Sequence, residues 1–269
     1  MKKLIFLLFI VLFSAACSKY QKAVKSTDPD FKYEKAMEYY HEEEYNKAYT
    51  LLDELLTLYR GTEKAADVYY YFAYTNFYLQ DFILAAYHFR NFNKTFPGND
   101  KTTEAAYMVG YCYYLQSPRA SLDQTYTYKA INELQLFINT HPTTDKIDDA
   151  NVLIDTLQQK LETKSYQKAK LYYDLGQYEA AVTTFNNTLN DFPDTRFREE
   201  AHYYKLVAAY EFAKNSIMAK KRQRYIEART ASNEYQRLYP EGKFINKVSD
   251  YGKKIELALI AINKDTNNS

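Results

Sequence analysis

The chain repeats one arrangement of apolar residues along its length. Each copy is built around an alanine, and these alanines are Ala48, Ala85, Ala130, Ala181 and Ala228. An aromatic residue lies three positions before the alanine in four copies, as Tyr45, Phe82, Tyr178 and Tyr225. Large apolar residues follow four or seven positions after it, as Phe89 and Phe92 follow Ala85. A proline ends four of the copies, as Pro97, Pro142, Pro193 and Pro240.

This arrangement predicts a stack of helix pairs. Residues four and seven apart lie on one face of a helix, a small alanine lets the second helix approach the first, and a proline stops the helix. The pattern resembles the tetratricopeptide repeat, whose period is about 34 residues. Here the alanines are 37, 45, 51 and 47 residues apart, so the excess must lie in longer turns or longer helices. We therefore predict an all-α protein, a right-handed superhelix of five tetratricopeptide-like helix pairs (an α-solenoid).

Three segments depart from the regular repeat. Residues 116–126 contain Ser117-Pro118-Arg119 and separate the helices of the third pair. Residues 215–224 form a basic insertion inside the fifth pair. Residues 146–175 contain neither Gly nor Pro, which predicts one long helix that links an N-terminal part to a C-terminal part.

The N-terminus has the pattern of a lipoprotein signal. Lys2 and Lys3 precede an unbroken apolar run of about ten residues, which is too short for a membrane-spanning helix of about 20. Small residues follow, and then Cys17. This resembles a bacterial lipobox, although Ser14 stands where that pattern usually has Leu, and it implies that Cys17 is acylated after cleavage before it. The alternative is an ordinary secretory signal with an incidental cysteine.

The patterns together predict an organisation in five parts. These are a lipoprotein signal peptide at 1–16, a lipid-anchored tether at 17–29, repeats one to three at 30–145, repeats four and five at 146–263, and a polar tail at 264–269.

Composition and charge narrow the classes of function. Loss of Lys2 and Lys3 with the leader lowers the net charge from +1 to −1, which gives no electrostatic reason to expect nucleic acid as a partner. The four histidines show no metal-binding spacing, and the six glycines form no phosphate-binding loop. We therefore predict no enzymatic activity, no metal and no cofactor. With Cys17 acylated, Cys112 has no disulfide partner and is expected to be a small core residue.

Tyrosine is the most informative residue type, at 30 residues with no tryptophan. By register, the first helix of each of the first three pairs places aromatic residues, and one methionine, on the concave side of the stack. An aromatic trough suits the alternating side chains of an unfolded β-strand, although packing between repeats uses the same residues. The candidates for substrate binding are Tyr33, Met37, Tyr40, Tyr70, Tyr74, Phe77, Tyr107, Tyr111 and Tyr114.

The C-terminal pairs have fewer aromatic residues at the concave positions than the N-terminal pairs, and they carry a charged edge instead. Lys170 and Val207 take the places of Tyr74 and Tyr111. Arg196 and Arg198 lie between pairs four and five, where they form either a solvated turn or a docking edge for a partner domain. In the third pair, short polar residues are expected to cap a helix, with contact to a partner as a secondary role: Asp123, Gln124 and Thr127.

Several local sequences go beyond a generic repeat. They are Asp123-Gln124 with Thr127 and Ala130; Ala169, Tyr172-Tyr173, Gly176, Tyr178 and Ala180-Ala181; and Phe192-Pro193-Asp194-Thr195 with Glu200-Ala201. With the anchor, they resemble the BamD family, lipoproteins of the machine that folds β-barrels into the outer membrane. The basic insertion at 215–224 and the richness in Tyr have no place in that pattern.

The resemblance implies two partners and a location. One partner is the periplasmic domain nearest the barrel of a BamA-type insertase, docked on the C-terminal pairs. The other is unfolded outer-membrane protein, received by the N-terminal pairs. The resemblance implies that the chain contacts the membrane only through its lipid anchor. Residues 18–22 contain no acidic residues, which would resemble a surface-export signal, so we expect the chain to lie on the periplasmic side of the outer membrane. The alternative is a generic periplasmic repeat lipoprotein that scaffolds cell-envelope or peptidoglycan-associated proteins.

Overall fold

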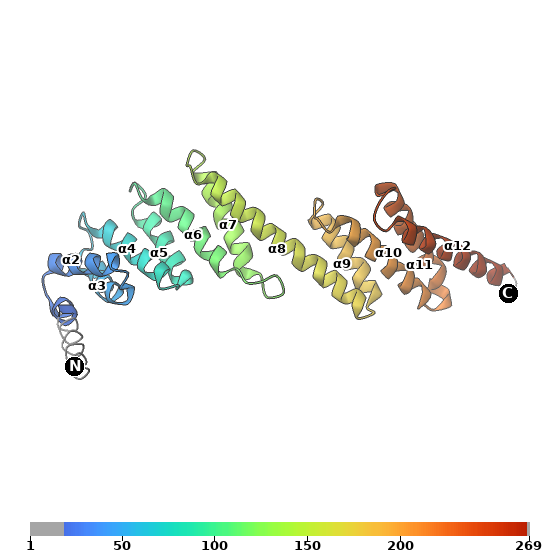
Figure 1. Cartoon of the computed structure of the whole chain (residues 1–269), viewed down its shortest axis with the longest axis horizontal. Coiled ribbons are helices and arrows are strands. Elements are labelled where there is room, and N and C mark those ends of the chain that lie inside the picture. Colours follow the sequence, from blue (N-terminus) through green and yellow to red (C-terminus); the bar gives the residue numbers. More distant parts are fainter. Residues whose placement is uncertain (1–18, 268–269) are drawn as a thin grey trace, which may run out of the picture. The chain divides into compact units, whose positions relative to one another are not determined.

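The computed structural model describes residues 19–267, which are helical apart from the turns between helices (Figure 1). Cys17 and the leader lie outside the described residues. After a helical segment at 19–25, the helices are α2 (Pro29–His41), α3 (Tyr45–Leu58), α4 (Ala65–Tyr78), α5 (Phe82–Thr95), α6 (Thr102–Gln116), α7 (Thr125–Thr140), α8 (Ile147–Asp174), α9 (Tyr178–Asp191), α10 (Arg198–Lys214), α11 (Met218–Leu238) and α12 (Ile245–Asn267). The predicted all-α class and helical-repeat solenoid are confirmed.

The repeated alanines lie where the two helices of a pair meet. All five are fully buried, and each stands in the second helix of its pair, α3, α5, α7, α9 or α11. Four of these second helices end at the residue that precedes a proline. Phe96, His141, Phe192 and Tyr239 share φ between −125° and −134° and ψ between 55° and 71°, because proline disfavours helical geometry in the residue before it. The first pair ends instead at Gly61, with φ 80°.

The turn inside three of the pairs has one residue in the left-handed conformation. Glu43, Gln80 and Gly176 have φ of 60°, 63° and 71°, and each lies five residues before the repeated alanine of its pair. A residue in this conformation ends a helix by reversing the chain direction, and glycine adopts it without steric cost. The same turn is therefore built with glycine once and with larger residues twice.

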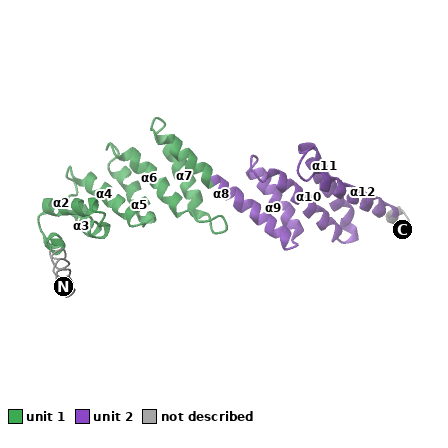
Figure 2. Cartoon of the chain, viewed as in Figure 1, with its two compact units in different colours: residues 1–157 green, residues 158–269 purple. Residues whose placement is uncertain are grey.

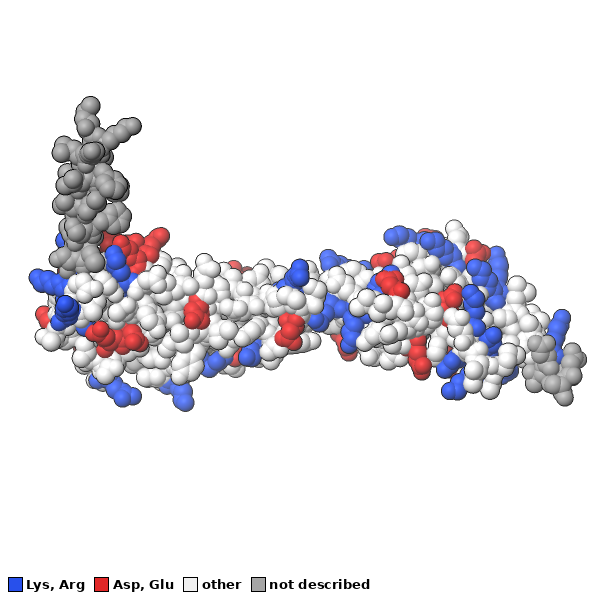
Figure 3. All heavy atoms as spheres, turned by 90° about the horizontal axis from the view of Figure 1, so that it is seen from below, with Lys and Arg blue, Asp and Glu red and all other residues white. Residues whose placement is uncertain are grey.

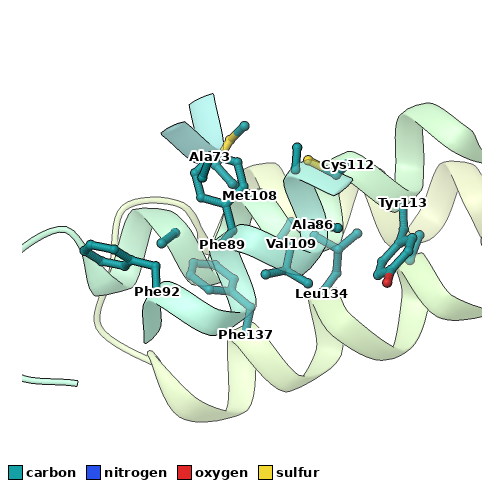
Figure 4. Packing of buried hydrophobic residues seen from close by; sticks show 14 of the residues in the cluster. Ala73, Ala86, Phe89, Phe92, Met108, Val109, Cys112, Tyr113, Leu134 and Phe137 are labelled. Carbon is teal, nitrogen blue, oxygen red and sulfur yellow. The ribbon is translucent and has the colours of Figure 1, made fainter. Parts of the chain in front are cut away.

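The chain divides into two compact units, one up to Leu157 and one from Gln158 (Figure 2). In unit 1, the large core cluster joins α4, α5, α6, α7 and the first half of α8, and Figure 4 shows Phe89, Leu134 and Phe137 among its buried side chains. In unit 2, Tyr166 and Ala169 of the second half of α8 pack with Phe185 of α9. The predicted long helix is thus present, and it contributes to both cores.

The extra length of the later repeats lies in two kinds of structure. In the third pair, residues 117–124 form a loop between α6 and α7. Gln124 is buried there, and its amide donates to the carbonyls of Arg119 and Leu122 at 3.0 and 2.9 Å. Asp123 accepts from the backbone N–H of Thr125 at 2.9 Å. Gln124 is the N-cap of α7, but its side chain makes no capping hydrogen bond; it braces the loop and accepts from the Thr127 hydroxyl at 2.6 Å, so the expected capping role is wrong for Gln124 and Thr127. In the fifth pair the basic segment adds turns to the start of α11 instead of forming a loop.

The segment predicted as a tether is partly folded against the first pair. Ala23 is fully buried in the core with α2 and α3, and the Tyr20 ring meets the Tyr39 ring edge-on at 5.8 Å. Lys32 of α2 is buried, donates to the backbone carbonyl of Val24 at 3.2 Å and forms an ion pair with Glu54. The chain is therefore docked from 19 onward. At the other end, α12 continues to Asn267, through much of the segment predicted as a polar tail.

Candidate functional site

Unit 1 carries a continuous set of partly exposed rings, which we call the aromatic face: Tyr40, Tyr45, Phe77, Tyr78, Tyr107, Tyr111 and Tyr114. Most of these rings come from the first helices of their pairs. Tyr40, Phe77 and Tyr114 are 37 residues apart and so occupy the same position in α2, α4 and α6. The repeat spacing therefore turns one aromatic position into a row.

Ring contacts link this face from one pair to the next. Tyr78 stacks on Tyr45 with ring centroids 4.6 Å apart and lies 6.0 Å from Tyr40. Phe77 lies 5.4 Å from Tyr78 and 6.0 Å from Tyr111. Tyr111 in turn stacks with Tyr107 and Tyr114 at 5.9 and 6.0 Å. Aromatic pairs favour offset-stacked or edge-on arrangements at such separations, so these contacts join the rings of the first three pairs into one connected set.

Two candidate residues are buried instead of lying on this face. Tyr70 and Tyr74 are 8% and 9% exposed and belong to the unit 1 core. Both hydroxyls donate to the carboxylate of Glu104 on α6, that of Tyr70 at 2.6 Å. Burial, followed by the bond to Glu104, raises the pKa of both phenols. In the structure these two tyrosines tie α4 to α6.

The other sequence candidates are partly buried. Tyr33 packs against the buried cluster formed by α2, α3 and the start of α4. Its ring meets the Tyr59 ring edge-on, with the ring centroids 6.1 Å apart. Met37 is half-buried. Burial raises the pKa of Tyr107 to about 12. Sequence reasoning missed Tyr45 and Tyr78, of which Tyr78 is 44% exposed. Tyr78 lies four residues after Tyr74 and so fits the same spacing as Phe77, which lies three after it, but only Phe77 was chosen.

Aromatic residues persist at two of the three corresponding positions in unit 2. Tyr166 and Tyr173 of α8 correspond to Tyr70 and Phe77, and α10 repeats the pattern with Tyr203 and Tyr210. Only the middle position changes: Lys170 lies over the rings of Tyr173 and Tyr204, and Val207 is buried. The thinning of aromatic residues in the C-terminal pairs is thus confined to this position.

Arg196 lies near the end of the loop between α9 and α10, and Arg198 is the first residue of α10. Arg196 is exposed, donates to the hydroxyl of Thr163 at 3.2 Å and lies 4.7 Å over the Phe197 ring. Arg198 is half-buried and donates to the carbonyl of Pro193. Both side chains brace the loop within unit 2, and Arg196 also presents charge to solvent.

Metal-ligating groups, the free thiol and membrane-spanning helices can be assessed over the described residues. Between residues 19 and 267, no group of three His, Cys, Asp or Glu side chains is placed to hold a metal ion. Cys112 is fully buried, and burial raises the pKa of its thiol to about 12, so it is a structural thiol with little thiolate. Over the same residues, no helix is both long and apolar enough to span a membrane. Cys17, the lipid-attachment candidate, lies outside them.

Comparison with known proteins gives one family and one curated relative. The family model YfiO, described as "Outer membrane lipoprotein", matches residues 25–225. The outer membrane protein assembly factor BamD of Caulobacter vibrioides is 29% identical over 119 residues, which is 44% of this chain and 39% of that protein. The chain therefore spans about two fifths of the length of that curated relative.

Solved structures with tetratricopeptide domains are also similar in part. The domain of P58(IPK) has 12% identity and a TM-score of 0.40, with coverage of 94% of this chain and 67% of that chain. The TPR2AB domain of yeast Sti1 has 12% identity and a TM-score of 0.38, with coverage of 85% and 98%.

Proposed function

The chain belongs to the family of outer membrane lipoproteins that this model describes, and we propose that it is a non-enzymatic scaffold subunit of the machinery that assembles β-barrels in the outer membrane. The observation that carries the proposal is the match over residues 25–225, which begins in the docked N-terminal segment and ends within α11. The matching BamD relative is named as an assembly factor. A scaffold role needs surfaces for partners and no reactive groups.

We assign the membrane attachment to a lipid on Cys17, on the periplasmic side. Several acyl chains on one cysteine hold a protein to a bilayer far more firmly than one chain does. Only Ser18 separates Cys17 from the segment that is docked on α2, so the first pair is held close to the bilayer surface. Cys17→Ala should abolish labelling by a clickable fatty acid and leave unprocessed or soluble protein. Equal labelling of both proteins contradicts the assignment.

The aromatic face is the surface that we assign to unfolded barrel segments. A β-strand presents alternate side chains to one side, and a row of rings gives apolar area while tyrosine hydroxyls tolerate water. Tyr111→Ala with Tyr114→Ala should therefore weaken capture of an unfolded barrel peptide by about tenfold, in line with losses above 1 kcal/mol at such contacts. Tyr128 is exposed on α7 and is not a member of the aromatic face, so Tyr128→Ala provides the Tyr→Ala control.

The loop of Arg196 and Arg198 is the edge that we assign to the insertase's periplasmic domain. Charged groups at the rim of an interface act mainly on orientation and association rate. Arg196→Glu with Arg198→Glu should slow association with that domain and spare the unfolded peptide, in titrations at fixed salt. Loss of both ligands by one variant that still unfolds cooperatively contradicts the division into two surfaces.

One experiment separates this function from the alternative of a scaffold for cell-envelope or peptidoglycan-associated proteins. The tagged mature chain is purified from a detergent extract of its own cells, and the recovered proteins are identified by mass spectrometry. A stoichiometric BamA-type barrel protein supports the proposal. Recovery of cell-wall proteins without any barrel protein supports the alternative.

A further inference from the structure

The turn between α10 and α11 carries a concentration of positive charge that the proposed function does not use. Residues 212–226 contain no acidic residue and five basic ones: Lys214, Lys220, Lys221, Arg222 and Arg224. Lys214 lies 3.6 Å from Glu211, and Arg222 meets the amide of Asn263 at 3.2 Å. Lys220 and Lys221 form no ion pair with any residue that the structure describes. Figure 3 shows Lys and Arg side chains gathered on unit 2.

A surface hollow of about 790 Å³ lies beside this turn. Its walls include the aromatic rings of Tyr172, Tyr178 and Phe212, which come from α8, α9 and α10. Arg224 also lines it, with its guanidinium 3.6 Å over the Phe212 ring and a bond to the hydroxyl of Ser216 at 2.6 Å. These contacts hold a cation against an apolar wall. Lys168 adds a second positive charge to the lining.

Four exposed aliphatic side chains stand close in the sequence to lining residues, although none of the four lines the hollow itself. Leu171 and Leu175, at 56% and 62% exposed, flank the lining residue Tyr172 and precede Gly176. Ile217 and Met218, at 67% and 59%, begin α11 two residues after the lining residue Asn215. Exposed apolar side chains on segments that also line a hollow are consistent with an interaction site.

We propose that this hollow binds an acidic, apolar segment of a partner protein. Its apolar side chains enter between Tyr172, Tyr178 and Phe212, and its carboxylates meet Arg224, Lys220 and Lys221. Charge complementarity selects this occupant. The lining holds two cations, Lys168 and Arg224, and one carboxylate, Glu179. Lys220 and Lys221 precede Arg224 on α11 by four and three residues, and nearby Glu211 is paired with Lys214.

This site is separate from the edge assigned to the insertase domain. Arg198 begins α10 and Lys214 ends it, and a helix of 17 residues spans about 25 Å. The two surfaces therefore lie at opposite ends of one helix. The inference does not depend on a role in barrel assembly, because it rests only on the chemistry of unit 2, and either proposal can fail alone.

The test uses the full mature chain and a short fluorescent peptide of alternating Glu and Phe. We expect saturable binding that weakens as salt rises, because exposed charges are screened over about 10 Å at 0.1 M ionic strength. Lys220→Glu with Lys221→Glu should weaken binding at least about fivefold at low salt and remove most of the salt dependence. Ile217→Ser with Met218→Ser should weaken binding and leave the salt dependence intact.

Matched controls make the outcome specific. Lys253 and Lys254 are adjacent and exposed on α12 of the same unit, so Lys253→Glu with Lys254→Glu makes the same change in charge and should bind the peptide like the parent. A peptide with Lys in place of Glu should not bind. Peptide binding that is absent, or equal in all variants, overturns the proposal. So does binding of phosphatidylglycerol vesicles, or of a second copy of the chain, in place of the peptide.

Discussion

The contact between α6 and α7 gives the sharpest test of how the helices of a pair meet. Gly110 occupies the α6 position that corresponds to Ala73 in α4 and Ala36 in α2, at 37-residue intervals. A Cβ atom at Gly110 would lie 2.7 Å from both Cγ and Cδ2 of Leu134, and 3.2 Å from its backbone nitrogen. We therefore predict that Gly110→Ala destabilises unit 1 although alanine is the better helix former.

Two opposing effects set the size of this loss. Carbon atoms pack at about 3.5–4.0 Å, so Leu134 must move by roughly 1 Å. Such overpacking costs about 1–3 kcal/mol, whereas replacing glycine by alanine inside a helix returns about 1 kcal/mol. The net destabilisation is thus about 1 kcal/mol. Gly98 has no atom within 4 Å of its hypothetical Cβ, so Gly98→Ala is the control and should change the stability by less than about 0.5 kcal/mol.

A double-mutant cycle with Leu134→Ala isolates the clash. In that background the added methyl group meets no leucine side chain, and Gly110→Ala should become neutral or stabilising, with a coupling energy above about 1 kcal/mol. Amide hydrogen exchange in α6 and α7 measures the stability of unit 1 separately from unit 2. Additive effects of the two substitutions would refute the assigned contact.

Three further predictions follow from buried groups. Ala85→Leu and Ala181→Leu should each lower stability by about 1–3 kcal/mol through overpacking, and melting like the parent would show that our helix register is wrong. Lys32→Ala leaves the partly buried backbone carbonyl of Val24 without its donor, so the segment 19–25 should exchange its amide protons faster while α6 is unaffected; unchanged exchange contradicts the docking. Burial, and then nearby Lys205, lowers the pKa of His202 to about 4. As pH falls below the usual histidine value the unfolded chain binds the proton first, so unit 2 should lose on the order of 3 kcal/mol by pH about 4. His202→Gln should remove most of that loss in acid-unfolding curves.

The helix pairs could be predicted because their determinants are local. A proline fixes the geometry of the residue before it, which is why Phe96 and His141 end their helices as expected. A buried alanine marks a close helix contact wherever it recurs. Lys32 could not be predicted as a buried residue, because its partners Val24 and Glu54 come from elements on either side of α2.

For the candidate site, the sequence predicted which aromatic residues share one side of a helix, but not which of them are buried. The three-four spacing places Tyr70, Tyr74 and Phe77 together on α4, yet it does not say which of them faces the next pair. The position of Glu104 decides this. It lies on α6, which follows in the chain, and its carboxylate accepts hydrogen bonds from the hydroxyls of Tyr70 and Tyr74. The same limit applies in unit 2. Val207 is buried, but the spacing alone does not say whether its position faces the core or the solvent.

The central claim is that this chain serves the assembly of β-barrels, and the folded fraction of a barrel protein in the outer membrane measures it most directly. Depletion of the chain in its own cells should lower that fraction, seen as heat-modifiable mobility on gels. The parent gene should restore it, and the Tyr111→Ala, Tyr114→Ala variant should restore it poorly although it reaches the membrane at the parent level. Barrel proteins that stay folded and abundant after complete depletion would contradict the account.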